Sequence, residues 1–152
     1  ELRRDLALVS RRTLPRLDNL PASLGAPVLS EARARLLALP AAATEPDVFI
    51  HADLYARHLV LDDAMTLCGV IDWGDVCLGD RAVDLDVVYA FLPAGARAAF
   101  WDEYGEVSAA TRERARFFAL ARHAVTLLDY ALDVGDQPLA EEAAFALRNA
   151  LE

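Results

Sequence analysis

Lysine is absent from the 152-residue sequence, in which all fifteen basic residues are arginine. The chain therefore offers no amine nucleophile, and it has no lysine to grip the phosphates of a nucleotide. Acidic residues outnumber basic residues by 24 to 15, which gives a formal net charge of −9. Because nucleic acid repels a negative chain, we expect no nucleic-acid partner.

Cysteine is scarce, and long apolar runs are missing. The two cysteines, Cys68 and Cys77, provide neither a disulfide framework nor a four-ligand zinc site. Wholly apolar runs such as residues 87–93 are far shorter than the ~20 residues of a membrane span, and no basic stretch followed by an apolar one opens the sequence. We therefore expect a cytoplasmic protein with no membrane partner.

The composition is nevertheless sufficient for a folded core, because 55% of the residues are hydrophobic and the mean hydropathy is +0.22. We expect a single domain over residues 1–152, of mainly α structure with a small β hairpin (an α+β fold). Its periodicity divides it into three segments. These are a helical lead-in (1–46), a segment with short β-type runs that carries the candidate chemistry (47–92) and a helical tail (93–152).

Capping residues and helical periodicity locate the expected helices. The first is predicted over residues 1–20, and the second begins at a Ser30 cap. The tail is predicted to hold one long helix from a Ser108 cap to Gly135, and a last helix beyond Pro138. Two shorter helices are expected at residues 82–92 and 94–101.

Three β-type runs interrupt this helical pattern. They are residues 48–50, 58–61 and 67–71, with residues 62–65 as the turn that joins the last two into a hairpin.

Polar residues directly follow two of these runs. The first is followed by His51-x-Asp53-x-x-x-x-His58, which has the spacing of a protein-kinase catalytic loop except that histidine replaces the asparagine. The last is followed by Asp72-Trp73-Gly74, which matches the kinase D-F-G motif with Trp for Phe. In phosphoryl transfer one carboxylate accepts the proton of the attacking hydroxyl, and other ligands hold the metal ions that neutralise the phosphates.

The stretch FIHADLYARHLVLDD…LCGVIDWGDVCLGDRAVDLDVVY resembles the core of the aminoglycoside phosphotransferase family, protein-kinase-like small-molecule kinases whose relatives include choline kinases. The family pattern is H-G-D-x-H-x-x-N, then I-D-W/F, then G-D-P-x-x-D-L-A. Residues 48–90 match it in order and in spacing. The resemblance implies the C-terminal lobe of a protein-kinase-like fold, which transfers the γ-phosphoryl group of ATP or GTP to a hydroxyl of a small molecule such as an aminoglycoside.

The resemblance also implies roles for five residues. Asp53 would be the catalytic base, His51 would brace its loop, and Asp84 would accept hydrogen bonds from the N–H groups of that loop. His58 and Asp72 would bind the metal ion that accompanies the nucleotide, which is Mg²⁺ or, as an alternative, Mn²⁺.

Three positions depart from the family pattern: His58 replaces Asn, Ala52 replaces Gly, and Arg81 replaces Pro. The substitution at His58 matters most, because imidazole is a softer and bulkier ligand than an amide oxygen. A kinase of this type also needs a glycine-rich loop and a lysine in an N-terminal lobe, and neither occurs before residue 47. We therefore expect the N-terminal nucleotide-binding lobe, a part of the same polypeptide, to be absent from this chain, and the isolated fragment to be inactive.

The sequence also allows purely structural roles for these residues. Asp53 and Asp72 can simply end strands and cap turns. Aromatic residues are predicted to pack in the core rather than to form a stacking wall for substrate. They are Trp73, Phe91, Trp101, Phe117 and Phe118. The acidic residues of the tail are predicted to form a solvated face, with Asp129 or Asp133 as alternative contacts for an amine of a cationic substrate.

Two other functions also remain open. The first is a pseudokinase-like module that binds nucleotide or ligand without turnover, which applies if His58 cannot hold a metal ion and the parent protein lacks the lysine. The second is a metal-dependent hydrolase with four ligands, since histidine and carboxylate suit a transition metal. Those ligands would be His51, Asp53, His58 and Asp72.

Overall fold

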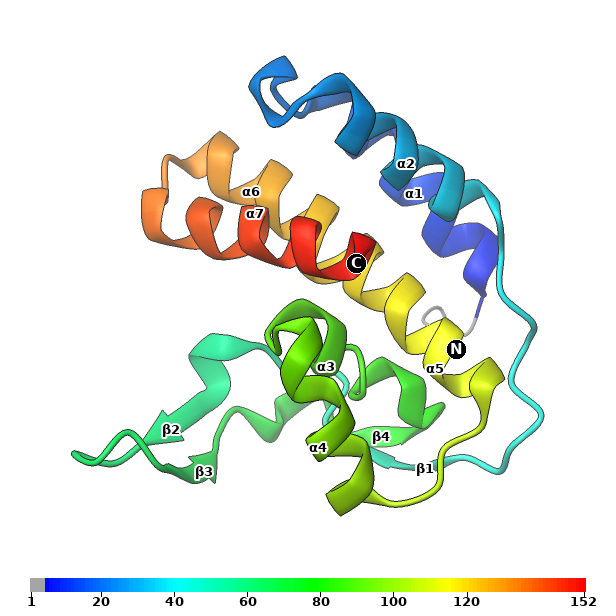
Figure 1. Ribbon diagram of the computed structural model, residues 1–152, viewed down its shortest axis with the longest axis vertical. Helices are drawn as coiled ribbons and strands as arrows, with labels where there is room; N and C mark the ends of the chain where they lie inside the picture. The colour runs from blue at the N-terminus through cyan, green and yellow to red at the C-terminus, as the bar shows by residue number, and fades with distance from the viewer. Residues whose placement is uncertain (1–4) are drawn as a thin grey trace.

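The computed structural model describes residues 5–152, and most of this part of the chain is helical (Figure 1). The α-helices are α1 (Leu6–Asn19), α2 (Ala26–Leu37), α3 (Val87–Ala90), α4 (Ala94–Tyr104), α5 (Ala109–Phe118), α6 (Leu127–Val134) and α7 (Gln137–Leu151). A π-helical stretch, η5 (Ala119–Thr126), connects α5 to α6. The strands are β1 (Val48–Ile50), β2 (Leu59–Leu61), β3 (Leu67–Val70) and β4 (Cys77–Gly79). Together they give the predicted combination of a mainly helical chain with small antiparallel sheets.

A continuous helical rod of α5, η5 and α6 runs through the middle of the molecule, and α1 and α7 pack along it. The rod corresponds to the long helix predicted from the sequence. Ser108 caps it by accepting a hydrogen bond from the Thr111 N–H, and Gly135 ends it with a left-handed φ of 71°. The π-helical geometry in its centre was not predicted. Among the residues described, no helix is long and apolar enough to cross a membrane.

The lead-in forms two helices, but the second begins earlier than predicted. Helix α1 ends at Asn19, as expected, while the predicted residues 1–4 lie outside the described part of the chain. Helix α2 begins at Ala26, so Ser30 lies inside it and does not cap it. Pro27 occupies the first turn, where its fixed φ suits a helix and its missing N–H costs nothing, and this explains the earlier start.

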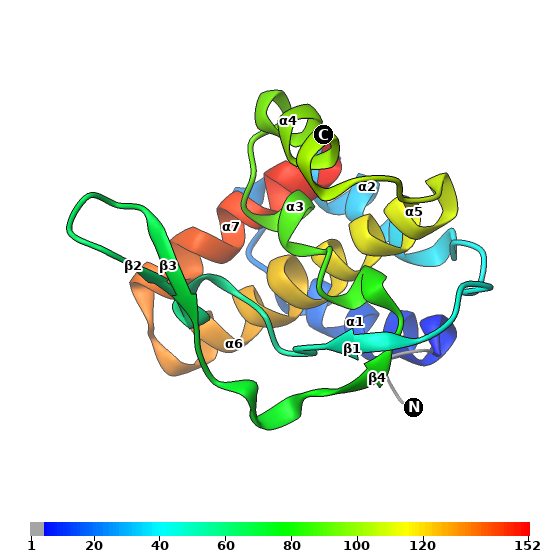
Figure 2. The ribbon, with the colours of Figure 1, turned by 90° about the horizontal axis from the view of Figure 1, so that it is seen from below.

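The strands form two separate antiparallel pairs. Strands β2 and β3 make the predicted hairpin, which projects from the helical body (Figures 1 and 2). Strand β1 pairs instead with β4, with Val48 opposite Gly79 and Ile50 opposite Cys77. The sequence analysis did not predict β4, because Cys77–Gly79 contains no β-branched or aromatic residue, unlike the equally short β1.

The predicted helix over residues 82–92 was wrong in extent. A 3₁₀ turn over Arg81–Val83 precedes the short helix α3, and Asp80 caps this turn by accepting from the Ala82 N–H. Asp80 also forms a buried ion pair with Arg114 of α5, with 2.6 Å between Oδ2 and Nε. This pair fixes the end of β4 against the central rod.

The core lies between the rod, α3 and α7, and it contains most of the predicted aromatic residues. Trp101, Phe117 and Phe118 are buried, and Phe91 packs against the core. The prediction for Trp73 was wrong, because this side chain is 53% exposed beside the candidate site. Its indole N–H donates to the Val70 carbonyl, which satisfies the polar edge without burial of the ring.

Candidate active site

The loop after β1 is held in place by the side chain of Asp84. One carboxylate oxygen of Asp84 accepts from the His51 N–H at 2.6 Å, and the other accepts from the Ala52 N–H at 2.9 Å. Hydrogen bonds to a charged acceptor are stronger than bonds between neutral groups, so this contact fixes the backbone just before Asp53. The contact has the form that the family resemblance implied for Asp84.

Ala52 adopts a left-handed backbone conformation, with φ at 69°, and its side chain is fully buried. An L-residue with a Cβ is strained there, whereas glycine is not. The position is the one at which the family pattern has glycine. The chain therefore holds an alanine in a conformation that glycine adopts without strain.

His51 connects the loop after β1 to the segment that carries Asp72. Its Nε2 lies 2.8 Å from the carbonyl oxygen of Ile71, and its Nδ1 accepts from the Asp53 N–H at 3.3 Å. Both ring nitrogens therefore contact backbone groups, which suits the tautomer with the proton on Nε2. Because neither nitrogen is free, His51 is unsuited to bind a metal ion, and the four-ligand hydrolase loses one of its ligands.

His58 and Asp72 approach each other across the site. Nε2 of His58 lies 3.3 Å from Oδ2 of Asp72, and Nδ1 of His58 lies 2.8 Å from the carbonyl oxygen of Asp53. His58 is buried, with 9% of its side chain exposed, whereas the Asp72 side chain is 66% exposed. Metal-binding histidines commonly donate their second ring N–H to a backbone carbonyl, so the orientation of His58 fits a ligand role.

The pair of His58 and Asp72 provides one imidazole and one carboxylate. Mg²⁺ that binds with a nucleotide takes one or two carboxylates and completes its shell with phosphate oxygens and water, so Asp72 suits this ion, whereas the imidazole of His58 suits Mn²⁺ better. Among residues 5–152 no group of three or more His, Cys, Asp or Glu side chains is arranged to hold a metal ion.

Asp53 is half exposed and lines an open pocket of about 420 Å³. The other lining residues come from α1, from the loop after β1, and from η5 and α6: Arg16, Tyr55, Arg122, His123, Thr126, Leu127 and Tyr130. Burial raises the pKa of the Tyr55 hydroxyl, so this side chain presents a neutral phenol to the pocket.

A buried charged network beneath the loop was missed by the sequence analysis. Asp86 is fully buried, and its Oδ2 accepts from Nη1 of Arg122 at 2.9 Å while its Oδ1 lies 3.0 Å from Nε2 of His123. Arg122 also donates to the Ala52 carbonyl at 2.9 Å, and its Nη2 lies 3.9 Å from Oδ1 of Asp53. Arg122 and His123 lie in η5, and π-helical turns frequently occur at functional sites. An acidic residue in an apolar run was the one available signal, because a buried charge requires a partner.

The acidic tail residue Asp129 is already paired. Its carboxylate accepts from Arg16 at 2.9 Å and from Asn19 at 3.2 Å, so it connects α6 to α1. This contact disfavours the alternative in which Asp129 binds a substrate amine. Asp133 is exposed on α6 and does not line the pocket.

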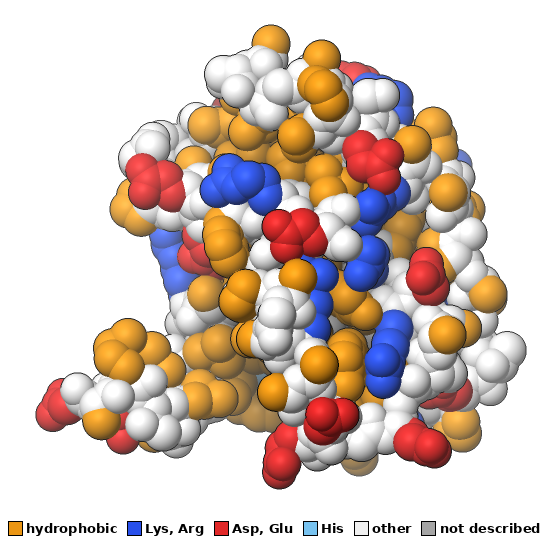
Figure 3. Space-filling view, in the orientation of Figure 1, with side chains coloured by type: hydrophobic (Ala, Val, Ile, Leu, Met, Phe, Trp, Pro, Cys, Tyr) orange, Lys and Arg blue, Asp and Glu red, His pale blue; other side chains and the backbone are white. Residues whose placement is uncertain are grey.

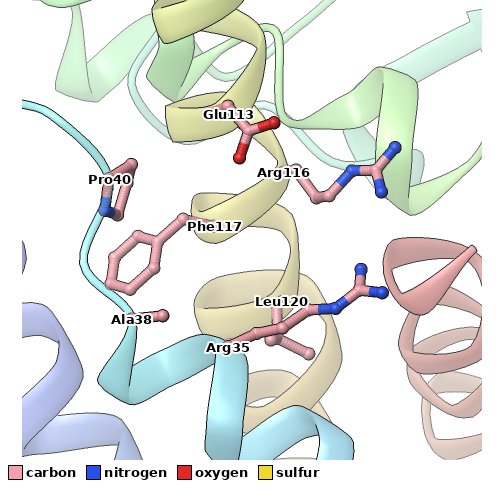
Figure 4. A pocket seen from close by; sticks show the side chains of 7 residues that line it. All are labelled: Arg35, Ala38, Pro40, Glu113, Arg116, Phe117 and Leu120. Atoms are coloured by element: carbon pink, nitrogen blue, oxygen red, sulfur yellow. The ribbon is translucent and has the colours of Figure 1, made fainter.

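A second hollow, of about 200 Å³, has only η5 in common with the first (Figure 4). Its lining comes from α2, the segment after it, α5 and η5. In Figure 4 the Phe117 ring points toward Pro40, while Arg35 and Arg116 point the other way. None of the five predicted site residues lines it.

A comparison with models of protein families matches residues 2–118 to the phosphotransferase enzyme family. The chain belongs to this family. The match covers more than half of the chain and includes all five predicted site residues, so the resemblance inferred from the motifs is confirmed at the level of the family. Membership of the phosphotransferase family implies transfer of a phosphoryl group, with a nucleotide and a small molecule as substrates. Searches among curated proteins and among solved structures gave no match.

Proposed function

We propose that this chain forms the acceptor side of an ATP- or GTP-dependent small-molecule kinase, with Asp53 as the catalytic base. The observation that carries the proposal is the pair of hydrogen bonds that the Asp84 carboxylate accepts from the loop, because they fix the backbone before Asp53. The Asp53 carboxylate itself borders the pocket. A base positioned by buried hydrogen bonds and open to a small-molecule pocket suits deprotonation of a bound hydroxyl.

In the proposed reaction, the acceptor hydroxyl gives its proton to the Asp53 carboxylate as its oxygen bonds to the γ-phosphorus. The bond between the γ-phosphorus and the bridging oxygen breaks, and the nucleoside diphosphate leaves. His58 and Asp72 would hold the Mg²⁺ or Mn²⁺ ion, which neutralises phosphate charge when it is bound. His51 keeps the Asp53 loop next to the strand that precedes Asp72.

The nucleotide-binding lobe is proposed to be a separate part of the same polypeptide, because this sequence contains no lysine to contact the phosphates. The isolated chain should therefore show no ATP-dependent phosphorylation of any acceptor. Phosphate transfer by the 152-residue chain alone would contradict this part of the proposal.

Asp53→Asn in the complete enzyme tests the assignment of the base. The variant keeps the size and most hydrogen bonds of the side chain but cannot accept the proton. We expect kcat to fall by ~10²–10⁴ with nucleotide affinity nearly unchanged. Asp63→Asn, in the exposed hairpin turn, is the matched control and should keep wild-type turnover. Wild-type turnover in Asp53→Asn would end the assignment, and nucleotide binding without any turnover in the wild type would identify the pseudokinase-like alternative.

His58→Asn tests the metal site. Imidazole favours Mn²⁺ over Mg²⁺ more than an amide oxygen does, so the variant should lower the concentration of Mg²⁺ needed for half-maximal activity relative to that of Mn²⁺. An unchanged metal preference would show that His58 does not contact the ion.

A further inference from the structure

The pocket beside Asp53 contains one carboxylate among its lining residues, and this is Asp53 itself. Two arginines, Arg16 and Arg122, line the same pocket. If Asp53 is the base, as the proposed function requires, the hydroxyl of the acceptor lies here, and the remaining lining residues determine which acceptors bind. The volume of about 420 Å³ lies in the range of small-molecule sites.

Two carboxylates next to the pocket are paired with its arginines, Asp86 with Arg122 and Asp129 with Arg16. Glu142 of α7 is not paired in this way: its Oε1 is buried without a hydrogen-bond partner, and it interacts electrostatically with the lining residues Tyr55 and His123. The lining itself holds two arginines and one carboxylate, so it offers more positive than negative groups to a ligand.

The pocket exposes charge of both signs, the carboxylate of Asp53 and the guanidinium of Arg16. Arg16 remains 45% exposed although its Nη1 binds Asp129, and a guanidinium has five N–H donors, so further donors remain for a ligand. Arg122 is less accessible, because its donors are engaged by Asp86, Ala52 and Val83. Arg16 is therefore the anion-binding group that the pocket offers.

The remaining wall is aromatic and apolar. Tyr55, Leu127 and Tyr130 line the pocket together with Asp53 and Arg16, and Tyr130 is 53% exposed. Tyrosine rings bind the flat or apolar body of a ligand and offer a hydroxyl at the edge. The pocket thus combines a proton acceptor, one anion-binding arginine and an apolar surface.

We propose that the acceptor is a small hydroxy acid: its hydroxyl lies at Asp53, its carboxylate at Arg16, and its apolar body against Tyr55, Leu127 and Tyr130. The lining therefore favours an anionic acceptor over a polycationic aminoglycoside.

Three probes with the same benzyl body test the charge preference on the 152-residue chain without nucleotide. They are 3-phenyllactate (anionic), 3-phenylpropane-1,2-diol (neutral) and 1-amino-3-phenylpropan-2-ol (cationic), which carry a hydroxyl on the same carbon. Binding is measured by ligand-observed saturation-transfer NMR and by calorimetry. We expect phenyllactate to bind about tenfold or more tightly than the amino alcohol, with the diol between them.

Arg16→Gln should reduce this preference to about threefold or less, because the amide keeps some hydrogen bonding but loses the charge. Arg11→Gln, on the same helix and outside the pocket, is the control and should keep the preference. Since the Arg16–Asp129 pair is partly exposed, circular dichroism should show that Arg16→Gln remains folded. Tyr130→Ala should weaken the binding of all three probes to a similar extent.

The inference is overturned if the amino alcohol binds as tightly as phenyllactate, if the preference survives in Arg16→Gln, or if the folded chain binds none of the three probes. It is independent of turnover. Wild-type turnover in Asp53→Asn alongside Arg16-dependent binding of phenyllactate would refute the proposed base and leave the pocket chemistry intact.

Discussion

The loop after β1 (residues 51–58) and the β2–β3 hairpin adjoin each other in the sequence, yet different contacts hold them. The loop is fixed from below by Asp84, and Arg122 binds its Ala52 carbonyl. The hairpin projects from the body and exposes apolar side chains, among them Met65 at 75% and Leu67 at 55% (Figure 3). The comparison shows that this chain fixes the geometry of its proposed base by itself, whereas the hairpin is held mainly by its own strand pairing.

The two proposed functional carboxylates differ in the same way. Asp53 follows two backbone N–H groups that are bound by Asp84, and its own N–H donates to His51. The Asp72 side chain is 66% exposed and approaches His58 at 3.3 Å. A base must be positioned before the substrate binds, whereas a carboxylate that meets a metal ion arriving with phosphates gains its position from that ion.

The largest effect is expected beneath the loop, from Asp86→Ala. The variant leaves Arg122 and His123 without their buried partner, which costs about 3–5 kcal/mol. Denaturant-induced unfolding measures the loss, and Asp102→Ala, an exposed carboxylate of α4, is the control with an effect within about 0.5 kcal/mol. A wild-type unfolding midpoint in Asp86→Ala would mean that the loop does not depend on the buried network.

Asp84→Ala should have the next largest effect. It leaves the His51 and Ala52 N–H groups without an acceptor, at about 1–3 kcal/mol, and should also abolish turnover of the complete enzyme. Asp84→Asn retains one acceptor oxygen and should lie between the wild type and Asp84→Ala in both measurements. If Asp84→Ala unfolds normally and remains active, the carboxylate does not position the loop.

Ala52→Gly should stabilise the protein, because glycine adopts the left-handed conformation without strain. The gain is expected to be about 1 kcal/mol, since the greater freedom of glycine in the unfolded state offsets part of the relief. Ala98→Gly, in the exposed part of α4, should instead lose about 1 kcal/mol. Thermal melts of the two variants should therefore shift in opposite directions, and a loss in both would show that Ala52 is not strained.

The smallest effect is expected in the hairpin, from Leu67→Thr. This side chain is exposed and threonine suits a strand, so the free energy of unfolding should change by about 0.5 kcal/mol or less. The same substitution at Leu147, which is fully buried in α7, should be severely destabilising. A large loss at Leu67 would show that the hairpin contributes to the core and would remove the contrast with the loop.

Short motifs predicted those site residues that lie close together in the sequence, because the chemistry of phosphoryl transfer requires particular residues at fixed spacings. His51, Asp53, His58 and Asp72 were found in this way, and the structure brings them together. The motif also gave the partner of the loop, Asp84. Whether these residues act as proposed stays a prediction.

The remaining contacts depend on residues far apart in the sequence. Arg122 binds groups 36 to 70 residues away, and no local pattern relates it to Ala52 or to Asp86. Strand β4 was missed for the same reason, since its pairing with β1 makes three ordinary residues into a strand. The exposure of Trp73 was missed because apolar character alone does not show which side of a turn faces solvent.

The π-helical stretch makes the pocket sensitive to the geometry of the central rod. A π-helix holds more residues in each turn than an α-helix, so everything beyond Thr126 is rotated relative to a regular continuation of α5. If the same residues wound as an α-helix, α6 would turn about its axis, and Asp129 and Tyr130 would shift away from Arg16 and from the pocket wall. Loss of one residue together with the return to α geometry would largely cancel this turn, because one residue of an α-helix corresponds to about 100°. A change of helical geometry in this segment therefore alters the pocket even when every lining residue keeps its identity, whereas a compensating deletion preserves it.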